Sequence, residues 1–465
     1  MTTPVRSDWF GDQGFRLDAT PYLSGALEAR KRLDALPNTM RLDRVTSGHD
    51  GGIFNGPKFS RIYLDNPEHS VPFLGSTDML EADLSFVPRL SKVIAERLNY
   101  LEASPGMSLI SCSGTIGRMA YVRSDMAGFW TSQHVMKVQP DSTMIPSGYL
   151  YTFLRSRFGI PMIVSSAYGA IIQHIEPHHI ADLPVPRFGG ALEQRVHELV
   201  EESARLRASF QARLAASTQD FFESVGLANL AEYRWHEQER DLGFVVDELS
   251  PVSLRAINHG KRASALKAQL ASVPHRTLGE ICAGGVLSRG ERFTRIETGP
   301  GEGLRFVGQR QAFWIRPEDR WIKAPPSASL LVGDETIVAT ARGLPSENGL
   351  FGRTILVTGA WTEYAYTEDF LRIGSGDPGV SGAYLYALLR SPLAFRLFRS
   401  MLSGAGPQNV HPSFLAGLPI PIASRDDHDR IAETVREAYR ERDRADELED
   451  EALELLTRAV EGAEV

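Results

Sequence analysis

The sequence predicts an α+β protein of two duplicated mixed α/β domains, joined and separated by two long antiparallel helices with pseudo-twofold symmetry. Three observations predict this fold class. The chain has 465 residues, which is more than one core usually fills. It repeats itself at an interval of 235 residues. A stretch with apolar residues at helical spacing closes each copy.

The repeat is clearest where YLYTFLRS (149–156) returns as YLYALLRS (384–391). Residues 149–186 and 384–421 align without a gap and share 15 of 38 residues, including the ends QHIEPHHIADLPVP and QNVHPSFLAGLPIP. Solenoid repeats have periods of about 20–50 residues. The longer interval therefore indicates two whole domains, with halves of roughly 1–225 and 226–465.

Each copy has the same internal order. Short runs with β-branched residues and Gly or Ser turns predict strands: SLISCSG, MAYVRS and HVMKVQP, then TIVATARG, TILVTG and FLRIG. A helical piece around YLY and an extended LPVP or LPIP follow. We expect the tyrosines and leucines of this helix to pack in the core rather than to bind a ligand.

The two closing stretches predict long helices that each pack lengthwise on a partner. The residues at this spacing are Leu192, Val196, Leu199, Ser203, Leu206, Phe210, Leu214 and Phe221, and Ile431, Val435, Ala438, Ala445, Leu448, Ala452, Leu455 and Ala459. Antiparallel pairing would place the globular parts at opposite ends of a rod. The expected division is a first domain at 1–188, a spacer helix at 189–225, a second domain with a leading linker at 226–423, and a second spacer helix at 424–465.

Charge and composition bound the function. The net charge is −8, and residues 424–465 alone carry 7 basic and 15 acidic residues. The globular parts are therefore nearly neutral. The acidic total argues against non-specific coating of nucleic acid but not against a basic patch on one face. The two cysteines cannot form a disulfide framework. No apolar run is long enough for a membrane span, and MTTPVRSDWFGDQG lacks a signal peptide's apolar region, so we expect the cytoplasm.

Motifs of enzymes are missing. There is no G-x-x-x-x-G-K-[ST] phosphate loop, no E-x-K or D-x-K nuclease element, and no N-P-P-[YF] or D-P-P-[YF] segment for a flipped adenine. QHIEPHH (173–179) could hold a metal, but its counterparts Asn409, His411, Ser413 and Phe414 could not supply the same ligands. A loop that enters a helix explains it better. We expect no catalytic residues and no metal.

A family resemblance follows from the order of these motifs. SGTIGR (113–118), HVMKV, YLY, QHIEPHHIADLPVP and EQRV before a long helix resemble the specificity subunit of type I restriction–modification systems. The second half repeats this order as NGLFGR, DFLRI, YLY, QNVHPSFLAGLPIP and DRI. The resemblance covers nearly the whole chain. Residues 1–35 and 226–270 match poorly, and the second copy has a longer loop at ARGLPSENG.

The resemblance implies two target-recognition domains that each read one half of a bipartite DNA site. Because the two copies have diverged, the full site should be asymmetric, and the helix length would set the unread gap. Two methyltransferase subunits carrying S-adenosylmethionine would bind the chain, and a motor-nuclease subunit would complete a restriction complex. The chain itself would bind no cofactor.

Arginine can grip guanine through two hydrogen bonds, and Gln, Asn or His can read other base edges. The candidate DNA-contacting residues are Lys58, Arg61, Ser76, Arg118, Gln133 and His134 in the first domain and Arg289, Arg292, Arg295, Arg310, Arg342 and Arg353 in the second. Arg118 and Arg353 occupy equivalent repeat positions and are expected to contact phosphate rather than bases. Gln173 and Gln408, also equivalent, are expected to fix a turn.

Two other functions remain open. The chain could direct a methylation-linked phage-defence complex with a different effector. It could also be a scaffold whose domains bind proteins and no DNA, although the loop arginines argue against this. A stand-alone enzyme fits the sequence least.

Overall fold

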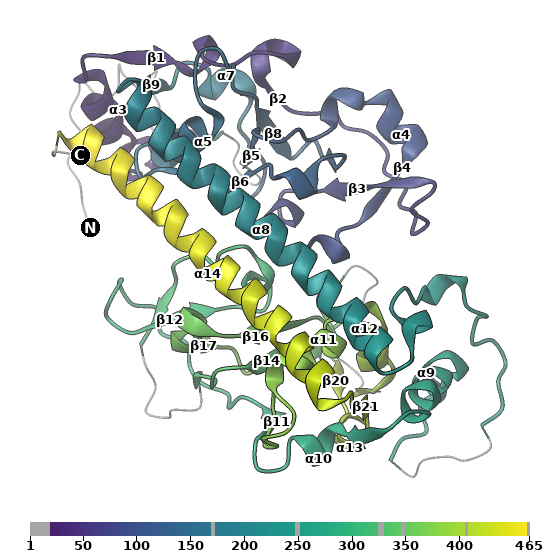
Figure 1. The fold of residues 1–465 in the computed structure, drawn as a ribbon. Coiled ribbons are helices and arrows are strands. Elements are labelled where there is room, and N and C mark those ends of the chain that lie inside the picture. Colours follow the sequence, from purple (N-terminus) through teal and green to yellow (C-terminus); the bar gives the residue numbers. More distant parts are fainter. Residues whose placement is uncertain are drawn as a thin grey trace. The chain divides into compact units, whose positions relative to one another are not determined.

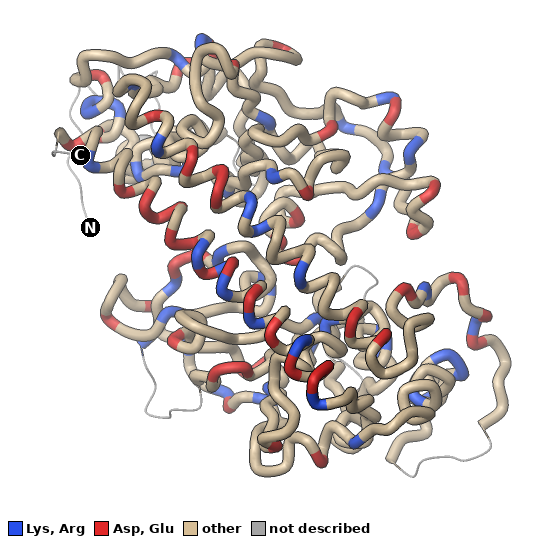
Figure 2. Tube along the Cα trace, in the orientation of Figure 1, with Lys and Arg blue, Asp and Glu red and all other residues tan. Residues whose placement is uncertain are grey.

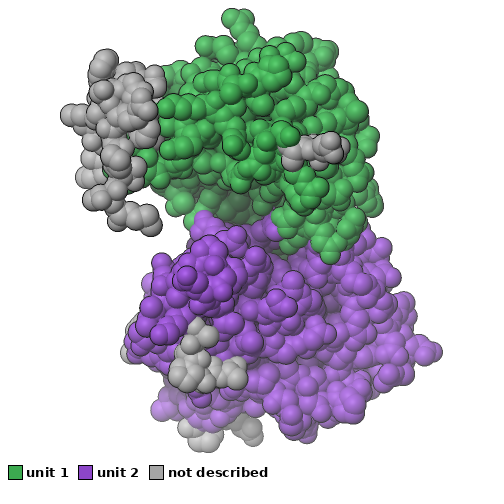
Figure 3. All heavy atoms as spheres, turned by 90° about the vertical axis from the view of Figure 1, so that its left-hand side faces the viewer, with its two compact units in different colours: residues 1–208, 444–465 green, residues 209–443 purple. Residues whose placement is uncertain are grey.

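The computed structural model describes residues 19–168, 173–246, 252–323, 330–345, 349–404 and 408–462. The chain divides into two compact units, coloured separately in Figure 3. Unit 1 comprises residues 1–208 and 444–465, and unit 2 comprises residues 209–443. This division assigns part of each long helix to each unit, whereas the sequence-based division separates the helices from the domains.

Unit 1 begins with a small helical segment and continues through short strands to the first long helix (Figure 1). Its elements are α2 (Thr20–Leu23), α3 (Ala26–Asp34), β1 (Thr39–Arg41), β2 (Ile53–Phe54), β3 (Ser70–Leu74), β4 (Arg89–Ser91), α4 (Lys92–Arg97), β5 (Ser108–Ser111), β6 (Met119–Tyr121), β7 (Trp130–Thr131), β8 (Val135–Val138), α5 (Ser147–Arg155), α6 (Gly159–Ser165), α7 (Pro177–Ile180), β9 (Pro184–Pro186) and the start of α8 (Gly190–Ser224).

Unit 2 repeats this order. Its elements are α9 (Lys261–Ala271), β10 (His275–Thr277), α10 (Leu278–Ile281), β11 (Val286–Arg289), β12 (Leu304–Val307), β13 (Trp321–Ile322), β14 (Thr336–Thr340), β15 (Arg342–Gly343), β16 (Thr354–Val357), β17 (Ala365–Tyr366), β18 (Phe370–Gly374), α11 (Gly382–Leu389), α12 (Pro392–Ser400), β19 (Leu402–Ser403), β20 (Gln408–Val410), α13 (Pro412–Ala416), β21 (Pro419–Pro421) and the first half of α14 (Arg425–Glu461).

Three sheets of each unit correspond strand for strand. Unit 2 has a further sheet, β15-β20-β19, where the described part of unit 1 has only the isolated bridges of His174 with Ser113 and Tyr168. A four-stranded antiparallel sheet has the order β2-β8-β5-β6 in unit 1 and β11-β18-β14-β16 in unit 2. A three-stranded sheet has the order β4-β3-β7 and β13-β12-β17, with β3-β7 and β12-β17 parallel. The pairs β1-β9 and β10-β21 complete the correspondence. The prediction of two duplicated mixed α/β domains is therefore confirmed.

One tight turn shows how closely the copies agree. The backbone N–H of Gly117 donates to the carbonyl of Ser111, and that of Gly352 donates to Thr340, over 3.1 and 2.8 Å. Both glycines have positive φ, +88° and +87°, which side chains rarely tolerate. Ser111 and Thr340 also donate their hydroxyls to the equivalent carbonyls of Thr115 and Leu350. The longer loop of the second copy therefore lies inside this turn; its residues 346–348 fall outside the described part of the chain.

The repeated YLY helix is a core element, as expected. Tyr149 and Tyr384 are fully buried, and each donates its hydroxyl to the last carbonyl of the following strand. The distances are 2.7 Å to Pro186 and 3.0 Å to Pro421. A buried phenol needs a hydrogen-bond partner, so this bond couples the YLY motif to the LPVP or LPIP motif.

The two poorly matching segments also supply equivalent structure. In unit 1, α3 packs on α6, and in unit 2, α9 packs on α12. Their buried residues are Ala26, Leu27, Ala29 and Leu33, and Ala263, Leu266 and Leu270. The helices keep apolar spacing without keeping identities. Residues 1–18 and 247–251 of these segments lie outside the described residues.

The long helices α8 and α14 run antiparallel in each unit. In unit 1, Ser203 on α8 donates its hydroxyl to the Ala445 carbonyl on α14 over 2.9 Å. Arg207, 7% exposed, lies 2.9 Å from a carboxylate oxygen of Asp446 and 3.1 Å from one of Glu449.

In unit 2, Phe210 packs edge-on against Tyr439, and Arg213 pairs with Glu437 and Glu441. Acidic residues are frequent along α14 (red in Figure 2). In each unit, carboxylates of α14 form ion pairs with arginines of α8, such as Arg207 in unit 1 and Arg213 in unit 2. The prediction of two long paired helices is confirmed.

Candidate nucleic-acid interface

Two equivalent loops lead from the first strand of the four-stranded sheet in each unit. NGPKFSRI (55–62) follows β2, and RGERFTRI (289–296) begins at the end of β11. They correspond at an offset of 234 because Ile53 pairs with Val138 and Leu287 with Ile373. Lys58 and Arg292 are thus equivalent, as are Arg61 and Arg295.

The arginines Arg61 and Arg295 occupy the same setting. The guanidinium carbon of Arg61 lies 5.4 Å from the Phe73 ring centroid, and that of Arg295 lies 5.2 Å from the Phe306 centroid. A second phenylalanine, Phe59 or Phe293, meets that ring edge-on at 6.1 or 6.3 Å. Cation–π contacts of this kind hold a guanidinium in one orientation.

Each arginine donates to the side chain two residues before the equivalent strand, β8 in unit 1 and β18 in unit 2. Arg61 Nη2 lies 2.7 Å from Gln133 Oε1, and Arg295 Nη2 lies 3.0 Å from Glu368 Oε2. We call the group made by each arginine and its two phenylalanines the Arg–Phe platform. The platform is common to both units, while the side chain it holds differs.

In unit 1 the platform holds a neutral pair. Gln133 Nε2 lies 3.1 Å from His134 Nε2. Burial lowers the pKa of His134, and the positive charge of Arg61 and the neighbouring His174 lower it further. His134 is therefore neutral at pH 7, with one nitrogen as donor and the other as acceptor. Amide and imidazole together can both donate and accept.

In unit 2 the platform contacts the carboxylate of Glu368, and a second carboxylate, Asp369, and two further arginines lie beside it. Arg342 Nη1 lies 3.3 Å from Asp369 Oδ1. Arg289 donates to Asn409 Oδ1 over 2.7 Å and to the Glu368 carbonyl over 3.1 Å. Burial raises the pKa of Glu368, but hydrogen bonds from the backbone and Arg295 outweigh it and hold that pKa below its usual range. Glu368 is an acceptor at pH 7.

The other predicted residues are more dispersed. Lys58, Arg292 and Arg310 are exposed, which suits contacts to phosphate. Ser76 is half-buried and follows β3. Its counterpart Gln309 was not among the predicted residues. The Gln309 side-chain amide donates to the carbonyls of Arg342 and Asp369, each over 3.3 Å.

Arg353 is less accessible than the other candidate arginines. It is 7% exposed, and its guanidinium carbon lies 4.5 Å from the Phe313 ring centroid. This burial counts against the expected phosphate contact, which stays a prediction. The equivalent Arg118 is half-buried at the tight turn, where its backbone N–H donates to Ser111 Oγ over 3.0 Å. Sequence equivalence identified the shared structural position but not the burial.

Gln173 and Gln408 lie at equivalent ends of the same turn. The backbone N–H of Gly114 donates to the Gln173 carbonyl over 3.1 Å, and Gly343 pairs with Gln408 between β15 and β20. Both therefore hold a glycine of the neighbouring loop through their backbone, and Gln408 does so as the first residue of β20.

Several residues near the platforms were not predicted. Asn55, Ser113 and His174 in unit 1 correspond to Arg289, Arg342 and Asn409 in unit 2, because Ser113 bridges His174 and Arg342 pairs with Asn409. The sequence signal that could have found them is the KFSRI–RFTRI match. These two segments are 234 residues apart, whereas the rest of the repeat has an interval of 235 residues, because the loops between them differ in length.

The described residues contain no group of three or more His, Cys, Asp or Glu side chains placed to hold a metal ion. In QHIEPHH, the backbone N–H of Glu176 donates to His179 Nδ1 over 2.9 Å at the start of α7. His411, the counterpart of Glu176, is itself the N-cap residue of α13, and its Nδ1 accepts from the backbone N–H of Ser413 over 3.2 Å. These histidines cap helices, as the loop-to-helix interpretation requires. No helix in the described ranges has the length and apolar character needed to cross a membrane.

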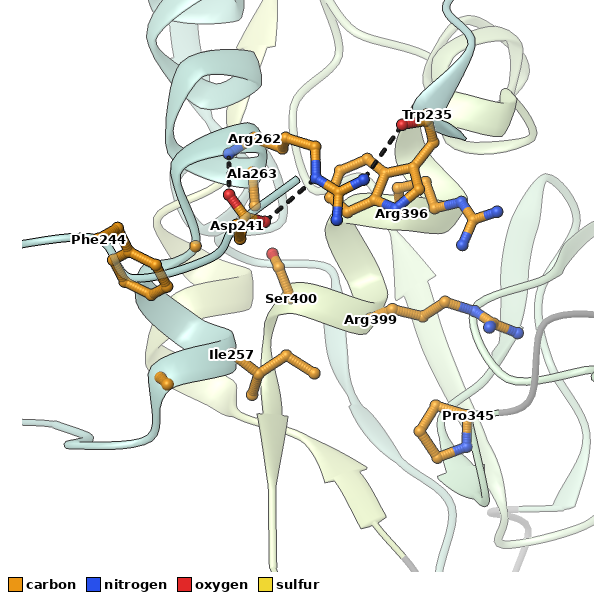
Figure 4. A pocket seen from close by; sticks show the side chains of 12 residues that line it. Trp235, Asp241, Phe244, Ile257, Arg262, Ala263, Pro345, Arg396, Arg399 and Ser400 are labelled. Atoms are coloured by element: carbon orange, nitrogen blue, oxygen red, sulfur yellow. Dashed lines mark hydrogen bonds and ion pairs between the residues drawn. The ribbon is translucent and has the colours of Figure 1, made fainter. Parts of the chain in front are cut away.

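A pocket of about 340 Å³ lies elsewhere in unit 2 (Figure 4). Arginines around it have partners within the chain. Arg262 Nε lies 3.2 Å from Asp241 Oδ2, and the Arg262 guanidinium carbon lies 4.1 Å from the Trp235 ring centroid. Arg399 donates to the Phe351 carbonyl over 3.1 Å. The side chains around it include no nucleophile held by a general base.

Comparison with known proteins found no matching family model and no matching curated protein. Among solved structures, the chain is similar to the type I restriction–modification S subunit of M. genitalium, with 12% identity, 90% of this chain and 93% of that chain covered, and a TM-score of 0.37. It is also similar to the HsdS subunit of Thermoanaerobacter tengcongensis, with 14% identity, coverage of 92% and 98%, and a TM-score of 0.27. A third structure concerns complex assembly and conformational transition of the type I R-M system, with 13% identity, coverage of 91% and 97%, and a TM-score of 0.27. Such low identities and TM-scores transfer no function to this chain.

Proposed function

We propose that this chain is a non-catalytic specificity subunit that reads a bipartite, asymmetric DNA site and directs methyltransferase subunits to it. The observation that carries the proposal is the duplicated Arg–Phe platform with different polar side chains in the two units. A fold element repeated for stability alone has no need to change its polar residues while keeping their support. A pair of readers for two different half-sites does.

The charges around the platforms support DNA as the ligand. Lys58 and Arg292 are exposed at equivalent positions, and Arg310 adds a third exposed cation. Such side chains neutralise phosphates and fix the register of a protein on the duplex. Acidic residues concentrate on α14, so the net charge of −8 does not describe the platform surface.

The proposed partners are two methyltransferase subunits with S-adenosylmethionine, with a motor-nuclease subunit in a restriction complex. The basis is the motif order of both halves and the paired helices α8 and α14, each of which lies partly in unit 1 and partly in unit 2. The catalytic chemistry would then belong to the partners. The compartment that follows from this function is the cytoplasm.

The test is methylome sequencing of a host that expresses the partner methyltransferase with and without this chain. We expect a two-part asymmetric methylated motif that appears only with the chain. If the complex assembles and the methyltransferase is active, but no motif depends on the chain, the specificity role is refuted. The scaffold function would then explain the duplicated domains better.

A further inference from the structure

We propose that Gln133 and His134 in unit 1, and Glu368 and Asp369 in unit 2, are the residues that make the two units read different bases. This inference rests on the proposed function and names the specificity determinants within it. These four residues occupy equivalent positions. The Cys112 N–H donates to the His134 carbonyl over 3.0 Å, and the Ala341 N–H donates to the Asp369 carbonyl over 3.4 Å.

The support around these positions is constant. Arg61 and Arg295 lie on equivalent phenylalanines and donate to Gln133 and Glu368 through the same Nη2 atom. An arginine held in this way is a positioning residue, because it fixes the rotamer of the side chain beside it. The constant part of the site therefore sets geometry, and the variable part sets chemistry.

The side chains that differ between the two units differ together, and their net charge stays the same. From unit 1 to unit 2, Gln133 and His134 become two carboxylates, while Asn55 and Ser113 become Arg289 and Arg342. Two negative charges are thus matched by two positive charges. A substitution of uncorrelated surface residues would not preserve this balance, so the four positions form one functional cluster.

The two sets have different hydrogen-bonding capacity. Glu368 and Asp369 only accept, and Arg289 and Arg342 only donate. Carboxylates accept from the exocyclic amine of cytosine, and an arginine fork matches O6 and N7 of guanine. Unit 2 is therefore expected to read at least one G·C pair.

The unit 1 set is neutral apart from Arg61. An amide such as that of Gln133 can pair with N6 and N7 of adenine, and neutral His134 can donate or accept beside it. Unit 1 is therefore expected to read at least one A·T pair.

Side-chain exposure permits these contacts in unit 2. Arg289 and Arg342 side chains are 34% and 41% exposed, and that of Asp369 is 26% exposed. Glu368 is 12% exposed, so it contributes mainly by holding Arg295. Asp369 with its two arginines is the expected contact surface.

The experiment transplants the unit 1 set into unit 2 by four substitutions: Glu368→Gln, Asp369→His, Arg289→Asn and Arg342→Ser. The variant complex with its methyltransferase is assayed by methylome sequencing and by selection from a randomised DNA duplex. We expect the half-site read by unit 2 to change at one or two positions, each with a preference altered by roughly tenfold or more, the discrimination of one bidentate contact. The half-site read by unit 1 and the gap should stay the same.

The matched control is Arg292→Asn, which removes a neighbouring charge without altering the set. It should weaken binding to all sequences and leave both half-sites unchanged. Folding of unit 2 is checked by the buried Cys282 thiol, which stays unreactive in a folded unit.

Two results would overturn the inference. One is an active four-site variant whose half-sites match those of the unsubstituted chain. The other is a folded variant that loses binding to all sequences equally, which would make these residues phosphate contacts. If the unsubstituted chain itself produces no chain-dependent motif, the proposed function fails before this inference is reached.

Discussion

Lys137 offers a test of how the sheet of unit 1 tolerates a charge. The residue lies on β8 and is fully buried. Its ammonium donates to Thr131 Oγ1 over 2.6 Å and to the Val135 carbonyl over 3.1 Å, and it lies 5.2 Å from the Phe54 ring centroid. Burial lowers the pKa of Lys137 to about 7, against 10.5 for an ordinary lysine.

The magnitude follows from these two pKa values. One pH unit between them corresponds to about 1.4 kcal/mol, so at pH 7 the unfavourable ionisation costs unit 1 up to about 4 kcal/mol, and at pH 10 about 1 kcal/mol. Between pH 7 and 10.5 the unfolded chain binds a proton that the folded chain does not. The free energy of unfolding therefore rises with pH across this window because of Lys137.

The perturbation is Lys137→Met, which keeps the length of the side chain and removes its charge. It also removes two hydrogen bonds, worth about 1 kcal/mol each. We expect the variant to be more stable than the parent by about 2 kcal/mol at pH 7 and less stable by about 1 kcal/mol at pH 10. The change of sign with pH is the diagnostic result.

The chain contains two cysteines, Cys112 in unit 1 and Cys282 in unit 2, and both are buried. A brief pulse of a methanethiosulfonate reagent in graded urea therefore reports the unfolding of each unit separately by mass spectrometry. Lys92→Met, at a partly exposed lysine of the same unit, is the matched control and should change stability little at either pH. An equal difference between Lys137→Met and the parent at both pH values would refute the reasoning, because Lys137 would then not titrate in this range.

Three further predictions use the same reagents or purified complex. Arg207→Met removes the buried ion-pair partner of Asp446 and should destabilise unit 1 by about 3 kcal/mol. Cys112 should then be labelled at a lower urea concentration, and an unchanged urea midpoint would show that the pair contributes nothing. Gly352→Ala combines a φ of +87° with contacts of 3.1 Å to neighbouring atoms, so it should destabilise unit 2 by more than the roughly 1 kcal/mol expected of Gly301→Ala, whose added carbon meets open space. Equal urea midpoints for the two glycine variants would contradict this. Arg292→Gln should weaken DNA binding and reduce the slope of log affinity against log salt by about 1, measured by fluorescence anisotropy; an unchanged slope would remove this residue from the phosphate contacts.

The sequence alone predicted the duplication, the strand-rich front part of each copy, the buried YLY helix and the two long helices. Each of these depends on short-range periodicity or on identities that repeat at a fixed interval. Tyr149 and Tyr384 could be assigned to the core because the stripe they belong to has helical spacing, and both are buried.

Only the tertiary structure separated the arginines that share a sequence pattern. Arg353 and Arg295 were both candidate DNA contacts, but Arg353 is buried against Phe313, whereas the Arg295 side chain beside Glu368 is 40% exposed. Neither outcome follows from local sequence, since both depend on which strands pair and where the chain returns.

The tertiary structure also revealed the correspondence of the two candidate readers. Loops of different length shift the offset between the copies from 235 to 234 at KFSRI and RFTRI, so a search in one fixed register passes over the match. Strand pairing restores it, because backbone hydrogen bonds fix which residues lie opposite each other whatever the length of the loops between them. The sequence by itself therefore determined that there are two copies, and the pairing of strands decided which side chains in those copies do the same work.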